Sequence, residues 1–509
     1  LQIDNGYVSA RESGGIVTSS VASGQVIING GTIDAKQLLF ANGTASYNQT
    51  GGLVILRGRF QRTPVAYTTV ANLTDISSST LNTNRLASGT NASYGSFNLE
   101  NAGNIYSVSG GTIRIYDVIN TPSGGAFDVK SSISNISVTG GTLEIMPASG
   151  TGTDATNYLI NSTAPLYNLL INRSGSTSAI LLETPLNVNN DLSLTSGILN
   201  ANSQNLSVGG NFNIEAGTTY TSGNNITTLN GSSGQTFTIS LAAALSLSSF
   251  TIDKPAGIAV TLAGTQNVIN VSAGFRLVAG TLNDAGKIVN VAGNVYNSGI
   301  CAGAGRIVLN GTAVQTIDGG GVFGNIELNN SNIAASPVSL IADMTVNGSL
   351  TLSRDKIFNI STYNLQLKSS ASIVNGGPAR FIQTAGNAGD GGITREFSNI
   401  SAFTFPLGVA GKYTPATIGF TAAPVTYGSI TVTPVDYEHP STTSNGQSLT
   451  YFWRVKSSGF SGIAANSVSH TFIYDQADVA GTETSYIPSL YDRAAYTWSN
   501  GLSGNINTT

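Results

Sequence analysis

The stretch Leu229-Asn-Gly-Ser-Ser-Gly-Gln-Thr236 returns 80 positions later as Leu309-Asn-Gly-Thr-Ala-Val-Gln-Thr316. Both copies place a leucine, an asparagine-glycine turn and a glutamine-threonine pair at the same spacing. Self-similarity at a fixed period is typical of repeat architectures, in which stacked units share one continuous core. We therefore interpret the chain as a repeat protein.

Other segments around this anchor recur in the same order. Asn168-Leu-Leu-Ile-Asn-Arg173 matches Ser249-Phe-Thr-Ile-Asp-Lys254 at an offset of 81 residues, and Ser196-Gly-Ile-Leu-Asn200 matches Ala279-Gly-Thr-Leu-Asn283 at an offset of 83. A more diverged third copy begins at Asn325-Ile-Glu-Leu-Asn-Asn330. Short runs with strand-like alternation and no helical period predict units of about 80 residues between residues 166 and 374, each divided into three or four coils.

The first 150 residues carry glycine pairs that lead into β-branched or aliphatic runs. The pairs are Gly14-Gly15, Gly30-Gly31, Gly51-Gly52, Gly110-Gly111 and Gly140-Gly141. Steps of 21 residues between the second and third pairs, and of 30 between the last two, fit one coil each. Glycine supplies the positive φ that a corner needs, and the alternating residues that follow favour strands around a narrow apolar core.

An independent β-sandwich in each long unit is the rival interpretation, because seven strands in about 100 residues also give frequent turn signals. The glycine-pair steps argue against it. So does the scarcity of large aromatic residues in the repeats, because a thin coil is filled by Val, Ile, Leu and Ala whereas sandwich cores bury bulky rings.

Asparagine recurs at the expected corners, at Asn200, Asn211, Asn230, Asn310 and Asn347. These side chains are expected either to form amide ladders between successive coils or merely to tolerate left-handed turn conformations. The sequence leaves both alternatives open.

Composition changes near residue 390. Residues 376–392 are rich in glycine, and the part from residue 400 onward holds 16 of the 39 aromatic residues together with both tryptophans and both histidines. We predict an all-β chain: a right-handed parallel β-helix (β-solenoid) followed by an antiparallel β-sandwich. The expected parts are a solenoid with short coils at 1–150, a loop around 151–156 followed by long repeats to residue 390, and the sandwich at 391–509, which caps the open edge of the solenoid.

Charge and motifs limit the function. Charged residues make up 9% of the chain and the net charge is −4 without a long run of either sign, so nucleic acid is an unexpected partner. Cys301, the single cysteine, lies between apolar neighbours and is expected to be buried. We find no phosphate-binding loop, no paired-cysteine motif and no calcium repeat, and predict no metal and no cofactor. Without a run of about 20 apolar residues, no transmembrane helix is expected.

Catalysis is not predicted either. Acids that a β-helix polysaccharide lyase or hydrolase would need in a cluster are scattered singly, at Asp34, Asp75, Asp117, Asp191, Asp284 and Asp343. We expect such lone acids to lie on solvated strand faces. His439 precedes a proline in an expected turn and His470 opens an expected strand, so no catalytic residue is assigned.

Four aromatic residues of the last part, Tyr451, Trp453, Tyr496 and Trp498, are candidates for stacking on sugar rings. The plainer interpretation places them in the core of the sandwich. Trp453 and Trp498 are the only ligand-binding residues that we single out.

The repeats of the Leu-Asn-Gly-(x)3-Gln-Thr kind, the Gly-Gly-Thr-Leu corners and the segment Phe405-Pro-Leu-Gly408 with Tyr413-Thr-Pro415 resemble the very large cell-surface proteins of Bacteroidota that the type IX secretion system exports, including gliding-motility adhesins. The resemblance implies an exported, extracellular adhesin or filament segment. Implied partners are the secretion and outer-membrane anchoring machinery, surface glycans or other cells, and further copies in filaments. The chain shows no initiator Met, signal peptide or sorting domain, and we interpret it as a mature or partial chain.

We therefore expect a non-catalytic surface stalk that displays binding surfaces. The alternatives are a β-helix polysaccharide lyase or glycoside hydrolase, and a carbohydrate-binding surface protein acting through residues 400–509.

Overall fold

The computed structural model describes residues 1–11, 16–18, 24–40, 45–56, 60–62, 72–76, 80–83, 97–99, 102–116, 126–146, 157–175, 178–443 and 446–500. Gly14-Gly15 and the expected loop at residues 151–156 lie outside these ranges. The chain forms two compact units, one of residues 1–293 and 299–306, the other of residues 294–298 and 307–509. The predicted limits at residues 150 and 390 stay predictions.

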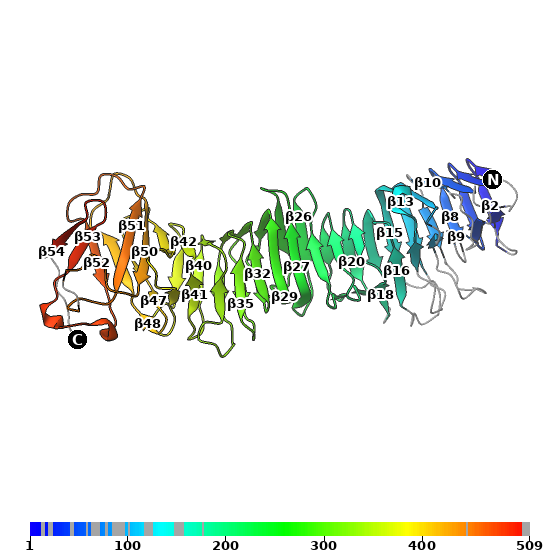
Figure 1. Cartoon of the computed structure of the whole chain (residues 1–509). Helices are drawn as coiled ribbons and strands as arrows, with labels where there is room; N and C mark the ends of the chain where they lie inside the picture. The colour runs from blue at the N-terminus through cyan, green and yellow to red at the C-terminus, as the bar shows by residue number, and fades with distance from the viewer. Residues whose placement is uncertain are drawn as a thin grey trace. The chain divides into compact units, whose positions relative to one another are not determined.

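The first unit is a parallel β-solenoid in which three strand segments make one turn (Figure 1). Its strands stack on three sides. The first side holds β2 (Tyr7–Ala10), β5 (Thr32–Ala35), β8 (Leu53–Leu56), β11 (Thr80–Thr83), β17 (Asn168–Asn172), β20 (Leu192–Ser196), β23 (Phe212–Ile214), β26 (Gln235–Ile239), β28 (Ala259–Ala263), β30 (Thr281–Asn283) and β33 (Ile300–Ala302). The second side holds β3 (Ile16–Thr18), β6 (Leu38–Phe40), β9 (Phe60–Arg62), β12 (Phe97–Leu99), β14 (Phe127–Val129), β16 (Tyr158–Ser162), β18 (Ala179–Leu182), β21 (Ile198–Asn200), β24 (Thr219–Thr221) and β31 (Ile288–Val291). The third side holds β1 (Gln2–Ile3), β4 (Gln25–Ile28), β7 (Ser46–Gln49), β10 (Asn72–Ile76), β19 (Leu186–Val188), β22 (Leu206–Val208) and β25 (Ile226–Leu229).

Four longer strands of this unit run through a corner, so each serves two sides. They are β13 (Ile105–Ile115), β15 (Ile136–Ile145), β27 (Leu245–Asp253) and β29 (Val268–Ala279). A short 3-10 helix, η1 (Ile133–Asn135), precedes β15. One turn takes between 19 residues, from Leu282 to its partner Cys301, and 33 residues, from Leu73 to Tyr106. The predicted parallel solenoid is confirmed.

The second unit has the same kind of construction, built from its own parallel strands. One side holds β36 (Val322–Phe323), β39 (Met344–Val346), β42 (Asn364–Leu367) and β45 (Gly392–Glu396). Another holds β34 (Arg306–Leu309), β37 (Ile326–Leu328), β40 (Ser349–Leu352) and β43 (Ser372–Val374). The third holds β32 (Asn294–Asn297), β35 (Gln315–Asp318), β38 (Val338–Leu340), β41 (Phe358–Ser361), β44 (Ile382–Thr384) and β47 (Leu407–Val409).

Parallel pairing gives way to antiparallel pairing within the second unit. Strand β45 pairs in parallel with β42 and antiparallel with β50 (Ser429–Val435), which pairs antiparallel with β51 (Phe452–Ser458). A second antiparallel sheet contains β46 (Ala402–Phe405), β49 (Ala416–Phe420) and β52 (Val468–Phe472). Strand β48 (Lys412–Tyr413) forms a hairpin with β47, and β53 (Ser489–Asp492) forms one with β54 (Thr497–Asn500). Two 3-10 helices, η2 (Gln476–Asp478) and η3 (Glu483–Ser485), lie between β52 and β53. The predicted antiparallel C-terminal sheets are confirmed.

The four glycine pairs within the described residues occupy corners, as predicted. Gly31 and Gly52 have φ values of +71° and +74°, and a Cβ atom at Gly52 would lie 2.7 Å from the carbonyl oxygen of Gly31 in the preceding coil. Glycine is therefore needed both for the backbone conformation and for the close approach of successive coils.

The solenoid core contains more aromatic residues than we expected. Phe97 stacks between Phe60 and Phe127 with ring centroids 5.0 and 5.2 Å away, and Phe212 stacks on Phe237 at 4.9 Å. Our argument against a sandwich from the scarcity of aromatic residues was therefore wrong, although its conclusion was right. Rings fit a thin core when they stack along its axis, one in each coil.

The sequence repeat of about 80 residues does not contain a whole number of coils. In the first unit, Asn168–Arg173 lies along β17 on the first side, whereas Ser249–Lys254 lies on the second half of β27 on the third side. The Leu-Asn pair of β21 is on the second side, and its counterpart in β30 is on the first. Each repeat spans eleven strand segments when β27 and β29 are counted twice. Eleven is not a multiple of three, so equivalent residues move to a different side with each repeat.

Candidate functional site

Many ionic and amide side chains in the described part of the solenoid bind backbone groups of a neighbouring coil. Lys254 Nζ donates to the carbonyl oxygens of Gly231 and Ser233, at 2.8 and 3.0 Å, and so closes the turn of the repeat anchor. In the third copy Asn330 takes this role, and its Nδ2 donates to the carbonyl oxygen of Ala313 at 2.7 Å. Burial lowers the pKa of Lys254 to about 8.

Other basic side chains close corners in the same way. In the first unit, Lys287 Nζ donates to the carbonyl oxygens of Gly264 and Gln266, at 2.7 and 2.8 Å. In the second unit, Lys356 Nζ donates to the carbonyl oxygen of Ala334 at 2.9 Å, and the Arg395 guanidinium donates to three backbone carbonyls of residues 368–371. These cations hold the fold together and do not form a basic surface stripe.

Asparagine and aspartate side chains accept hydrogen bonds from backbone N–H groups of a neighbouring coil. Asp191 Oδ1 accepts from the backbone N–H of Asn211 at 2.6 Å, and Asn211 Oδ1 accepts from the N–H of Thr236 at 2.9 Å, one coil further on. True amide pairs also occur, as between Asn190 Nδ2 and Asn168 Oδ1 at 2.8 Å. Amide-to-amide contacts between coils thus occur at other asparagines, whereas Asn211, one of the five named, binds the backbone of the next coil. Within a turn, Asn200 Oδ1 accepts from the N–H of residue 202 at 2.8 Å, and the left-handed backbone conformation is found at Asn202, with a φ of +52°, and not at Asn200.

Two of the scattered acids, Asp34 and Asp284, are buried, contrary to our expectation of solvated strand faces, whereas Asp343 is exposed. Asp284 is 4% exposed and its Oδ1 accepts from the N–H groups of Gly286 and Gly305, at 2.9 and 2.6 Å. Asp343 Oδ1 accepts from the N–H of Asn364 at 2.8 Å. An acid beside a corner satisfies backbone donors that the strand ladder leaves unpaired. Asp117 and the side chain of Asp75 lie outside the described residues.

One acid of the first unit joins an exposed cluster. Asp34 is 1% exposed, its Oδ2 accepts from the Tyr7 hydroxyl at 3.1 Å, and it forms an ion pair with Arg11. Arg11 also donates to the Tyr7 hydroxyl at 2.7 Å, and Tyr7 is 57% exposed.

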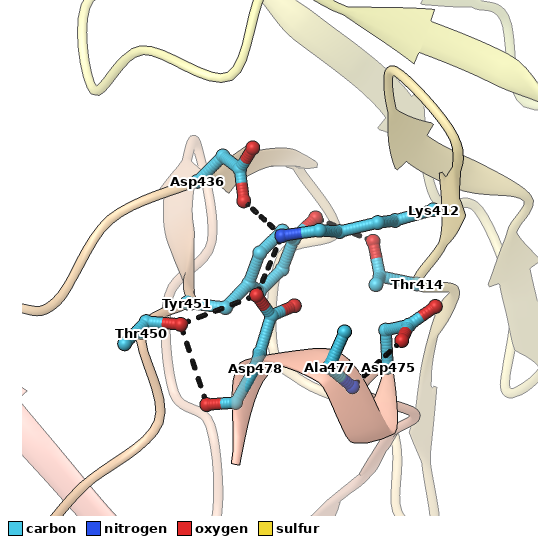
Figure 2. Close-up of polar contacts among 8 residues, drawn as sticks. All are labelled: Lys412, Thr414, Asp436, Thr450, Tyr451, Asp475, Ala477 and Asp478. Carbon is cyan, nitrogen blue, oxygen red and sulfur yellow. Dashed lines mark hydrogen bonds and ion pairs between the residues drawn. The ribbon is translucent and has the colours of Figure 1, made fainter. Parts of the chain in front are cut away.

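A partly buried ionic cluster lies among the antiparallel strands of the second unit (Figure 2). Lys412, in β48, extends its ammonium group between two carboxylates, 2.6 Å from Asp436 Oδ1 and 2.5 Å from Asp478 Oδ1. Asp436 directly follows β50, and Asp478 is the last residue of η2. Thr450 Oγ1 donates to Asp478 Oδ1 at 3.2 Å. We call Lys412, Asp436 and Asp478 the lysine–aspartate cluster.

Aromatic and hydroxyl groups enclose this cluster. The Tyr451 ring centroid lies 6.0 Å from Lys412 Nζ, and its hydroxyl is hydrogen-bonded to Thr414, which is fully buried. Burial raises the pKa of Tyr451 well above its ordinary value. Burial also disfavours the charge of Lys412, but hydrogen bonds to Asp436 and Asp478 outweigh this effect and raise the pKa of the lysine.

The two tryptophans lie in separate aromatic groups and both are half-buried. Trp453 Nε1 donates to the carbonyl oxygen of Thr414 at 2.9 Å, and its ring packs between Tyr451 and Phe472 with centroids 5.1 and 5.0 Å away. Trp453 therefore borders the lysine–aspartate cluster.

Trp498 Nε1 donates to the carbonyl oxygen of Ser441 at 3.0 Å, and the ring lies 5.0 Å from both His439 and Tyr491. The turn predicted at His439 is present, because its Nδ1 and carbonyl oxygen accept from the backbone of residues 441 and 442. Tyr451 is 2% exposed and Tyr496 is 79% exposed, so the four aromatic candidates do not form one platform.

Sequence reasoning missed the lysine–aspartate cluster, whose partners lie 24 and 66 residues from Lys412 along the chain. One signal was present: Lys412 is the single charged residue of the segment from Phe405 to Pro415. A lone charge in an otherwise uncharged segment is expected to have a partner when it is buried.

Cys301 is buried as predicted, and burial raises the pKa of its thiol to about 12. Within the described ranges, no three His, Cys, Asp or Glu side chains are grouped so that they could hold a metal ion. Among the same residues, no helix is long and apolar enough to span a membrane. Comparisons with models of protein families, with curated proteins and with solved structures found no match for this chain.

Proposed function

We propose that this chain is a non-catalytic segment of an exported cell-surface protein, adhesin-like in nature, that works as a stalk and displays binding surfaces outside the cell. One observation carries the proposal: each coil is joined to the next by parallel strand pairing and by side chains at the corners, as Lys254 and Asn211 illustrate. Such coil-to-coil locking gives stiffness without a cavity or cofactor. The resemblance to large exported surface proteins of Bacteroidota supports the location.

The proposed partners follow from this role. The secretion and outer-membrane anchoring machinery would place the segment at the surface, and glycans, other cells or further copies of the chain would be its contacts. Few charges and many neutral polar groups suit a surface that meets varied partners with little electrostatic selectivity.

The location is tested on intact cells of the organism that makes the protein. Antibodies against residues 178–443 are expected to label unpermeabilised cells, and added protease is expected to remove the label. A strain lacking the gene should adhere less to surfaces or to other cells. Labelling that requires permeabilisation would contradict the proposal.

A polysaccharide lyase is the second candidate, and the Tyr7, Arg11 and Asp34 cluster is the observation that favours it. A tyrosine hydroxyl beside an arginine is suited to remove a proton next to a sugar carboxylate that the arginine neutralises. Unsaturated ends released from acidic glycans, and abolished by Tyr7→Phe, would replace the stalk proposal with this one.

A further inference from the structure

In the lysine–aspartate cluster, the two oxygens of the Asp478 carboxylate differ in their hydrogen bonding. Lys412 and Thr450 both bind Oδ1 of Asp478, whereas Oδ2 of the same carboxylate is buried and has no hydrogen-bond partner. The Asp478 residue as a whole is 2% exposed. A buried carboxylate oxygen without a partner destabilises the fold, because it loses its hydrogen bonds to water and forms none with the protein.

The second carboxylate, Asp436, completes the groups that formation of an amide bond requires: an amine, a carboxyl group and a base. Asp436 Oδ1 lies 2.6 Å from Lys412 Nζ, so one amine touches both a buried carboxyl group and a separate base (Figure 2). The Asp436 side chain is 36% exposed, against 2% for Asp478, and so it stays in contact with water.

We propose that Lys412 and Asp478 become joined by an intramolecular amide bond, with Asp436 as the proton carrier. Asp436 takes a proton from the Lys412 ammonium, and the free amine attacks Cγ of Asp478. The Nζ–Cγ bond forms and the Cγ–Oδ2 bond breaks. Oδ2 leaves as water. Both protons of this water come from the Lys412 ammonium, and one of them is carried by Asp436. The reaction consumes no oxidant or other reactant, and the net charge of the three groups stays at −1.

The surrounding residues favour this step. Thr450 Oγ1 donates to Oδ1, the oxygen that becomes the amide carbonyl and gains negative charge during attack. The Tyr451 ring and the buried Thr414 limit access of bulk water, which would reverse the bond. Formation also removes the unpaired oxygen, and it replaces the buried charge of Asp478 and the partly buried charge of Lys412 by a neutral amide.

Such a bond would join β48 to η2 across 66 residues of chain. The segment that carries η2 would then stay attached to the antiparallel strands even when its weak local packing opens. This inference concerns covalent structure and does not depend on the proposed function.

The test is the intact mass of the purified full chain under denaturing conditions. We expect a mass lower than that of the sequence by one water. Tryptic digestion should yield a branched peptide in which the segment containing Lys412 is attached to that containing Asp478. An unmodified mass for the whole population would overturn the proposal.

Three variants identify the bond and the base. Lys412→Arg keeps the charge and should restore the full mass, and Asp436→Asn should do the same because the proton carrier is lost. Asp475→Asn is the matched control, because the Asp475 side chain accepts from the N–H of Ala477 at 2.9 Å and is not bonded to the lysine in Figure 2. The Asp475→Asn variant should still have a mass lower than that of its sequence by one water. Loss of water in the Lys412→Arg variant would overturn the linkage, and loss of water in Asp436→Asn would overturn the role of Asp436.

Discussion

At the scale of single residues, several charged side chains of this protein bind backbone groups and so join neighbouring coils. Lys254, 1% exposed, directly follows β27 and binds two carbonyl oxygens of a turn in the preceding coil. Corner carbonyls that point out of the strand ladder need donors, and a long flexible amine can satisfy two of them at once. The cost is a buried charge, which is why the pKa of Lys254 falls to about 8.

This lowered pKa makes stability depend on pH. Because the pKa of Lys254 is about 8 in the folded chain and 10.5 when unperturbed, the unfolded state holds more protons between these values. The free energy of unfolding should therefore rise with pH across this window, by at most about 1.4 kcal/mol per pH unit from this group. Below pH 8 the contribution should be flat. Denaturant unfolding at a series of pH values measures it.

Lys254→Met is the comparison that isolates the group, since all other titrating residues remain. The variant should lack the additional rise between pH 8 and 10.5. Parallel pH dependences of the two proteins would show that Lys254 is not the titrating group.

Residue-scale expectations succeeded where local sequence decides the outcome. The burial of Cys301 was predictable because its neighbours are small or apolar and strands alternate inside and outside. The lysine–aspartate cluster was not predictable, because the antiparallel pairing of β45, β50 and β51 decides which distant residues meet. Both tryptophans were named as candidates, but only the fold shows that their N–H groups bind backbone carbonyls.

At the scale of strands, the alternation of apolar and polar residues fixes which side chains enter the core but not which side of the coil a strand occupies. This explains why the repeat of about 80 residues was visible in the sequence while its eleven-strand composition was not. A strand that pairs on both edges and buries one face meets the same requirements on every side. Equivalent sequences can therefore occupy different sides, as β17 and β27 do.

Stacked rings should make neighbouring coils depend on one another. Phe237 packs on Phe212 at 4.9 Å and lies 5.9 Å from Phe250, and it is fully buried. Phe237→Ala should cost about 3–5 kcal/mol locally, because a large cavity opens in a thin core. Hydrogen exchange should accelerate in β23, β26 and β28, with little change in β16 and β17, since each coil contacts only its neighbours.

Phe237→Leu is the matched control, because it keeps most of the apolar volume and should cost less than about 1.5 kcal/mol. Uniform acceleration of exchange throughout residues 157–293 in the alanine variant would show that the first unit opens as one block. That result would refute the nearest-neighbour description.

At the scale of the whole molecule, a coil is the smallest part that can be removed while strand pairing is conserved. Residues 235–259 make up one turn, because Gln235 pairs with Val260 and Phe237 with Leu262 in the next coil. When these residues are deleted, Leu262 should take the inward position of Phe237 against Phe212. We expect this shortened chain to remain soluble and to unfold cooperatively, with its strand content reduced only by the lost coil, as measured by circular dichroism.

Deleting residues 235–258 instead removes one residue fewer and tests whether register decides the outcome. Val260 and Leu262 would then take the outward positions of Thr236 and Thr238, because successive residues of a strand face opposite sides. The chain must either expose these two side chains, at about 1.5–3 kcal/mol each, or accommodate Ala259 as one additional residue in the preceding turn. Both responses cost stability, so this variant should unfold at a lower temperature than the 235–259 deletion although it is longer. Equal unfolding temperatures would mean that the corners absorb a one-residue shift freely, and that the alternation of side chains does not set the register of this solenoid.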